Sequence, residues 1–274
     1  MTAFTLKKVN SLLFASTLGM VATLATGMRS QAITVAGDPT DYIVSPGTGF
    51  DGVVQLSLNI INTSVGRCTG SLLPTGLHIL TAVHCLTDNN GTFNIESGLA
   101  IFDLPTQRIE IPVAEFFIHP LWNRDFANAN DVAVLQLASE APAEAERYDL
   151  YRETDELNQL SVLVGYGRSG NGNEGDVFSD GLKRSGLNIY ETTGETFAPV
   201  FEILASAPIF EGFFGDKVTP GTLLVYDFDN GLPANDAFGR LGLGISDLGL
   251  GLGLDGSCPG RGNFRSSKSL LHQD

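Results

Sequence analysis

Basic residues are scarce in this chain. Its 274 residues contain 16 Lys and Arg against 31 Asp and Glu, which gives a formal net charge of −15 at pH 7 and an isoelectric point near 4.5. Proteins that bind nucleic acids are normally basic, so we expect no nucleic-acid partner. Charged residues of both signs make up only 17% of the chain and hydrophobic residues 43%, which excludes a disordered protein. What remains is an acidic, soluble, globular protein.

Helical periodicity built from Ala, Glu, Lys and Leu is also scarce, whereas Gly occurs 32 times and Pro 12 times. This composition favours short strands joined by turns. One series of strand-like runs covers residues 53–61, 68–73, 78–82, 98–102, 109–119 and 132–137. A second series covers residues 160–166, 186–192, 201–204 and 222–228. The polar stretch between the two series predicts an interdomain connection, and the strand spacing predicts compact antiparallel barrels or sandwiches.

The only long apolar run lies near the N-terminus. Lys7 and Lys8 precede an apolar stretch over residues 12–28, which ends at residues 30–32 (SQA). This order is typical of a secretory signal peptide, cleaved near Ala32. The alternative is a retained membrane anchor, but Ser, Thr and Gly dilute the run, and it is short for a membrane span. We therefore expect a secreted or periplasmic protein, with no membrane contact after the signal is removed.

Cysteine is limited to three residues. Cys68 and Cys85 can pair in an oxidising compartment, which leaves Cys258 without an obvious partner. The histidines lack the close pairwise spacing of zinc sites. Residues 227–231 (DFDNG) superficially resemble a calcium loop, as do residues 171–176, but in the first loop the glycine comes one position early and solvated turns explain both better. We expect no metal and no cofactor.

Three segments carry chemistry. Residues 67–73 read RCTGSLL, residues 81–85 read TAVHC and residues 130–137 read NDVAVLQL. Together they resemble the trypsin/chymotrypsin-like serine proteases (peptidase S1-like), of the bacterial secreted type, with their C-x-G-S-L, T-A-x-H-C and D-I-A-L-L-x-L segments. Residues 165–170 (GYGRSG) are similar to the G-W-G-x-T/S-G turn that opens the second barrel of these proteases. The resemblance spans about residues 52–255.

The resemblance implies an all-β protein with two six-stranded antiparallel β-barrels. It implies that His84 is the general base and that Asp131, 47 residues later, accepts the Nδ1 proton and orients the imidazole ring. A Cys68–Cys85 disulfide would pin the turn that bears His84 and would contribute about 3 kcal/mol by restricting the unfolded chain. The substrates would be proteins or peptides. His78 and His119 are better interpreted as packing or surface residues.

The expected nucleophile segment, G-D-S-G-G-P, has no match. The nearest residues in place are 255–260 (DGSCPG), where Pro259 removes a backbone donor two positions after Ser257. Ser257 is therefore better explained as a loop or tail serine than as the nucleophile. We expect an incomplete second barrel, with a reading-frame shift or truncation near Asp255, and a chain that hydrolyses peptides poorly or not at all. The alternatives are a non-catalytic homologue that holds a peptide in the same cleft, and an unrelated exported β-barrel binding module.

These observations divide the chain into consecutive segments. They are a signal peptide (1–32), a leader (33–51), an N-terminal barrel (52–140), an interdomain connection (141–156), an incomplete C-terminal barrel (157–255) and an atypical tail (256–274). Residues 33–37 (ITVAG) and 43–44 (IV) are candidates for the new N-terminus that activates family zymogens, but we interpret both as leader residues. The oligomeric state is not predicted.

Overall fold

The structure is a computed structural model that describes residues 33–35, 37–88, 90–125, 130–171, 175–205 and 218–226, together with positions 238 and 242. Several predicted features lie outside the described residues. They are the signal peptide (1–32), the acidic loop at 227–231, Cys258, Ser257 and the tail (256–274).

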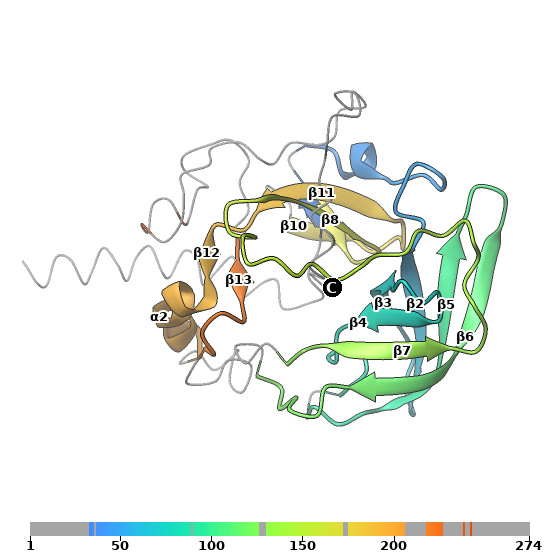
Figure 1. Cartoon of the computed structure of the whole chain (residues 1–274), viewed down its shortest axis with the longest axis horizontal. Coiled ribbons are helices and arrows are strands. Elements are labelled where there is room, and N and C mark those ends of the chain that lie inside the picture. Colours follow the sequence, from blue (N-terminus) through green and yellow to red (C-terminus); the bar gives the residue numbers. More distant parts are fainter. Residues whose placement is uncertain are drawn as a thin grey trace, which may run out of the picture.

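The first half is a closed antiparallel barrel of six strands, whose order around the barrel is β2-β3-β4-β7-β6-β5 (Figure 1). The strands are β2 (Val53–Ile60), β3 (Val65–Leu72), β4 (His78–Thr81), β5 (Ile95–Asp103), β6 (Arg108–Ile118) and β7 (Ala133–Leu137). Each strand of the first predicted series is confirmed, with ends that differ by a few residues at most. The all-β prediction is confirmed as well.

Alternation of apolar and polar residues explains why these segments form strands around one core. In β7, Ala133, Leu135 and Leu137 are buried and the two residues between them are not, as expected for side chains that point to opposite faces. Leu56 of β2 and Ile79 of β4 are completely buried in the same cluster. The short strand β4 pairs with β7 along its whole length. Because the pair is antiparallel, the last residue of β4 lies beside the first residue of β7.

The second half is formed by small sheets that lie beside the barrel (Figure 1). Strands β8 (Leu160–Gly165) and β11 (Arg184–Ile189) pair antiparallel, β10 (Gly175–Phe178) pairs with β9 (Ser169–Asn171), and β12 (Thr192–Thr193) pairs with β13 (Leu224–Val225). The predicted strands at 160–166 and 186–192 therefore correspond to β8 and, with shifted ends, to β11 and β12.

The predicted strand at residues 201–204 is wrong, because these residues belong to helix α2 (Gly194–Ala205). The four-residue run FEIL is too short to distinguish a strand from a helix, but over the longer window Phe197, Phe201 and Leu204 are spaced by four and three positions, which is helical. Phe197 is buried, and its ring lies 5.1 Å from the ring of Phe238.

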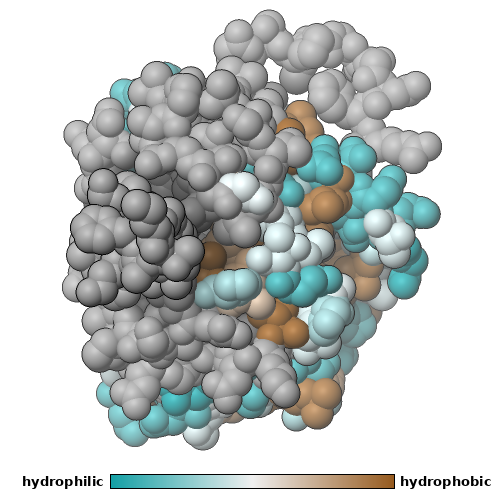
Figure 2. Space-filling view, turned by 90° about the vertical axis from the view of Figure 1, so that its left-hand side faces the viewer, coloured by the Kyte–Doolittle hydropathy of each residue, from teal (hydrophilic) through white to brown (hydrophobic). Residues whose placement is uncertain are grey.

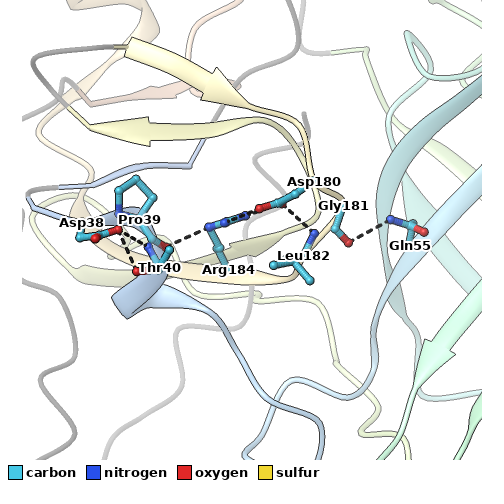
Figure 3. Close-up of polar contacts among 8 residues, drawn as sticks. All are labelled: Asp38, Pro39, Thr40, Gln55, Asp180, Gly181, Leu182 and Arg184. Carbon is cyan, nitrogen blue, oxygen red and sulfur yellow. Dashed lines mark hydrogen bonds and ion pairs between the residues drawn. The ribbon is translucent and has the colours of Figure 1, made fainter.

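The segment predicted as a leader lies against the second half. Strand β1 (Ile33–Val35) pairs in parallel with β9, and the 3-10 helix η1 (Pro39–Tyr42) follows it. Arg184, only 2% exposed, donates from Nε to the Pro39 carbonyl and holds both carboxylate oxygens of Asp180 at 2.8 and 2.7 Å (Figure 3). One buried guanidinium therefore fastens this segment to the turn before β11.

Within the described ranges, no helix is long and apolar enough to cross a membrane. On the face seen in Figure 2, hydrophilic and hydrophobic residues are interspersed over the part that is coloured.

Candidate active site

A disulfide joins the barrel strand β3 to the turn that follows β4. Cys68 and Cys85 are bonded, with their Cα atoms 6.2 Å apart, and they are 17 positions apart in the sequence. The pairing implied by the family resemblance is therefore confirmed. Because Cys85 directly follows His84, the disulfide restrains the backbone that carries this histidine.

The barrel brings His84 and Asp131 together. In the β4–β7 pair, Thr81 lies opposite Ala133, so the turn after β4 meets the residues that precede β7. The turn is anchored by Val83, which is completely buried and whose carbonyl accepts a hydrogen bond from Leu86. Two residues separated by 47 positions thus become neighbours through the strand register.

Asp131 contacts His84 with both carboxylate oxygens. His84 Nδ1 lies 2.6 Å from Asp131 Oδ2, and the His84 backbone N–H donates to Asp131 Oδ1 at 2.8 Å. The two side chains are 29% and 18% exposed, so the pair is partly shielded from water while the ring remains accessible. These two contacts orient the His84 ring and the Asp131 carboxylate relative to each other.

Such an arrangement suits proton transfer. A carboxylate on Nδ1 holds the neutral imidazole in the tautomer that carries its proton on Nδ1, so Nε2 can accept a proton from a nucleophile. The same carboxylate stabilises the imidazolium that results.

The other histidines predicted to have packing or surface roles make local contacts. His78 Nδ1 lies 2.8 Å from the Thr75 hydroxyl, and His119 Nδ1 accepts the Leu121 backbone N–H at 3.3 Å. Ser257 lies outside the described residues. Within the described part of the chain, no group of three or more His, Cys, Asp or Glu residues could hold a metal ion.

Sequence reasoning missed a group of polar residues between the two halves. Lys183 is only 5% exposed; its ammonium donates to the Phe50 carbonyl at 2.7 Å and lies 5.5 Å from the centroid of the Tyr166 ring. The Tyr166 hydroxyl donates to Asp103 at 3.2 Å, and its backbone N–H donates to the Thr69 hydroxyl at 3.0 Å. From the sequence, Tyr166 is identified only as part of the turn at residues 165–170 that is similar to G-W-G-x-T/S-G.

Burial changes the acidity of this group. It lowers the pKa of Lys183, and three nearby carboxylates oppose that change. Burial also raises the pKa of Tyr166 far above its ordinary value, and the Asp103 carboxylate adds to the rise. Nothing in the local sequence around residue 183 signals a buried cation, because its partners come from distant segments.

Known proteins resemble parts of this chain. Human chymotrypsin-like elastase family member 3A is 38% identical over 78 residues, which cover 27% of this chain and 28% of the elastase. Rat chymotrypsin-C is 36% identical over 90 residues, 31% of this chain and 32% of that protein. The alignments therefore span less than a third of each of these two relatives. Among solved structures, HL collagenase has a TM-score of 0.43 and 18% identity, covering 54% of this chain and 61% of that one.

A second solved structure, the protease Anisep from Arthrobacter nicotinovorans, has a TM-score of 0.43 and 11% identity, covering 55% of this chain and 68% of that one. The family model described as Trypsin matches residues 49–198, which include the disulfide, His84 and Asp131. This match takes in more than half of the sequence. The chain belongs to the trypsin family of chymotrypsin-like serine proteases.

Proposed function

We propose that this protein is a serine-type endopeptidase that hydrolyses proteins or peptides, poorly because the G-D-S-G-G-P segment has no match in its sequence. In this proposal His84 is the general base and Asp131 is the residue that orients it. The observation that carries the proposal is the 2.6 Å contact between His84 Nδ1 and Asp131 Oδ2, beside the Cys68–Cys85 disulfide. Family membership supplies the reaction class.

In this reaction, Nε2 of His84 takes the proton of a serine hydroxyl as its oxygen attacks the peptide carbonyl. The imidazolium then donates that proton to the leaving amine, and an acyl-enzyme remains. Water, deprotonated by the same ring, releases the acid product. Asp131 keeps its charge throughout and stabilises the imidazolium.

The attacking serine is not assigned, and Ser257 is the residue to test. A fluorophosphonate reacts covalently with a serine only when a base activates it. Full-length protein is incubated with this reagent beside His84→Ala and Ser257→Ala variants, and the modified peptide is located by mass spectrometry. Stoichiometric labelling that His84→Ala abolishes supports the proposal, and loss of labelling in Ser257→Ala would assign the nucleophile.

A folded chain that stays unlabelled would contradict the proposal and support a non-catalytic peptide-binding homologue. Near-UV circular dichroism with a thermal melt establishes folding in the same samples. The disulfide and the N-terminal apolar run support export to an oxidising compartment, as a secreted or periplasmic protein. A free thiol at both Cys68 and Cys85 in native protein would contradict that localisation.

A further inference from the structure

Among the residues that the structure describes, strand β3 has an edge close to His84 that is only partly paired. It pairs with β2 from Val65 to Ser71, but it pairs with β4 only at Ser71 and Leu72. Within the part of the chain that the structure describes, no strand covers the β4 side of residues 65–67. An edge of this kind presents backbone N–H and C=O groups to which an extended peptide can add as a further strand.

The backbone of Arg67 points to this open side. Successive residues of a strand direct their hydrogen-bonding groups alternately to the two sides. The Leu73 N–H bonds to the His78 carbonyl, and the Thr69 carbonyl accepts the Thr81 hydroxyl, so odd-numbered residues of β3 face the β4 side. Arg67 is also an odd-numbered residue, so its backbone groups face the same side, but β4 does not extend far enough to lie opposite it.

Arg67 is also within a short peptide's length of His84. The two residues directly precede Cys68 and Cys85, whose Cα atoms are 6.2 Å apart. With 3.8 Å between consecutive Cα atoms, the Cα atoms of Arg67 and His84 are at most about 14 Å apart. An extended peptide covers this distance with about four residues.

The Arg67 side chain is exposed, and its guanidinium makes no hydrogen bond or ion pair with any described residue. It lies against the second half, where a Cβ on Gly181 would be 2.7 Å from Arg67 Nη1. Gly181, at φ +74°, leaves room for the guanidinium, and its carbonyl accepts Gln55 Nε2 (Figure 3). The neighbouring carboxylate of Asp180 is held by Arg184. The charge of Arg67 is therefore positioned, and no carboxylate among the described residues neutralises it.

We infer that Arg67 selects peptides that carry Asp or Glu at the position opposite it, when the peptide lies along the β3 edge within about four residues of the cleaved bond. This inference rests on the proposed endopeptidase function. Opposite charges that face each other across a strand pair attract, whereas like charges repel. In a chain with a net charge of −15, an arginine that pairs with none of the described residues, in the same region of the barrel as His84, is also a local feature that favours an acidic segment.

The test uses full-length protein and labelled peptides in which each of the four positions on either side of the cleaved bond is Asp, Ala or Lys in turn. Arg67→Ala removes the charge and Arg67→Glu reverses it. Arg152→Ala removes the same charge from an exposed residue of the interdomain segment and is the matched control.

We expect one of the varied positions, the one that lies opposite Arg67, to show a charge preference. At that position the wild type should cleave the Asp peptide with kcat/KM about fivefold above that of the Lys peptide at low salt. Arg67→Ala abolishes this preference, Arg67→Glu reverses it, and Arg152→Ala keeps it. A preference that is absent at every position, or that survives in Arg67→Glu, overturns the inference.

Failure of the proposed function gives a different result, because no peptide is then cleaved by any variant. In that case fluorescence anisotropy of the same labelled peptides decides the inference: tighter binding of the Asp peptide that depends on Arg67 supports it. Equal binding of the Asp and Lys peptides, or no binding of either, overturns it.

Discussion

The Lys183 ammonium lies 2.7 Å from the carbonyl oxygen of Phe50, a residue 133 positions earlier in the chain. Phe50 leads into the first barrel strand, whereas Lys183 leads into β11 of the second half. A buried cation thus bonds to the backbone of the other half, and the Tyr166 ring lies beside it. The contact is one of several that join the two halves, together with those of Tyr166 to Thr69 and Asp103.

Replacement of Lys183 by Met tests this contact. The methionine fills most of the space but leaves the Phe50 carbonyl without its donor and the nearby carboxylates without their cation. We expect the free energy of unfolding to fall by about 2 kcal/mol, the usual range for a hydrogen bond that involves a charged group. Urea unfolding followed by circular dichroism measures the change, with Arg152→Ala as the control. A fall below about 0.5 kcal/mol would place this variant with ordinary surface substitutions.

Alkaline titration should separate buried from exposed tyrosines. Burial raises the pKa of Tyr148, Tyr166 and Tyr190 far above the ordinary value of 10. Tyr151 has its pKa raised to about 12 by its hydrogen bond to Asp155. In the unfolded chain these three tyrosines lose their protons near pH 10, so the stability linked to their raised pKa values is present below pH 10 and is lost as the pH rises further.

We therefore expect tyrosinate absorbance at 295 nm to rise in two stages, with Tyr148, Tyr166 and Tyr190 ionising only when circular dichroism shows unfolding. A single smooth rise near pH 10, complete in the folded protein, would contradict the burial of these residues. Tyr166→Phe should remove one third of the late stage.

The first barrel could be predicted from sequence because each strand carries its own signal. In β7, for example, buried residues alternate with less buried ones, and this pattern can be read from the strand's own sequence. The His84–Asp131 pair could be expected only through the family motifs. The spacing of 47 residues alone does not show that the end of β4 meets the start of β7. The contact between Lys183 and Phe50 could not be predicted, because the apolar pattern identifies a buried face but not the distant segment that covers it.

Helix α2 shows a second reason for failure. The apolar run at 201–204 is too short to distinguish a strand from a helix, and Pro199 interrupts the helical pattern. A Pro inside a helix lacks the N–H that would bond four residues back, so propensity argues against a helix there. Packing of Phe197 against Phe238 supplies a tertiary contact that no local pattern contains.

Asp180 gives a prediction for acid stability. Its hydrogen bonds with Arg184 lower the pKa of the carboxyl from 3.8 to about 2. A carboxyl whose pKa is lower in the folded protein contributes stability above its unfolded value, and this contribution is lost as the pH falls through the folded value. Asp180→Asn should therefore be less stable than the wild type at pH 6, and the difference should shrink between about pH 4 and pH 2.

Urea midpoints measured at each pH provide the comparison. Since Asp180 is itself partly exposed, solvent screening keeps the difference modest. A difference that stays constant down to pH 2 would show that the ion pair is not its cause.

The disulfide should stabilise the first barrel. Replacing both Cys68 and Cys85 by Ala removes the constraint on the unfolded chain, and the loop model predicts a loss of about 3 kcal/mol. Thermal and urea unfolding of the double variant should both shift downward, while dithiothreitol should destabilise the wild type and leave the variant unchanged. If the wild type and the double variant were equally sensitive to dithiothreitol, the disulfide would not be the source of the stability.

Asp131→Asn separates orientation of the histidine from stability of the fold. The amide can keep a contact with His84, but its NH2 group can donate to Nδ1. This contact stabilises the tautomer whose proton is on Nε2. A general base must be unprotonated at Nε2, so this tautomer cannot accept the proton of the nucleophile. We expect kcat to fall about 10⁴-fold at neutral pH, with little change in KM. The thermal midpoint should move far less than in the double cysteine variant, because no cavity is formed. A kcat within tenfold of the wild type would show that Asp131 does not set the tautomer of His84, and the proposed mechanism would then need a different partner for the ring.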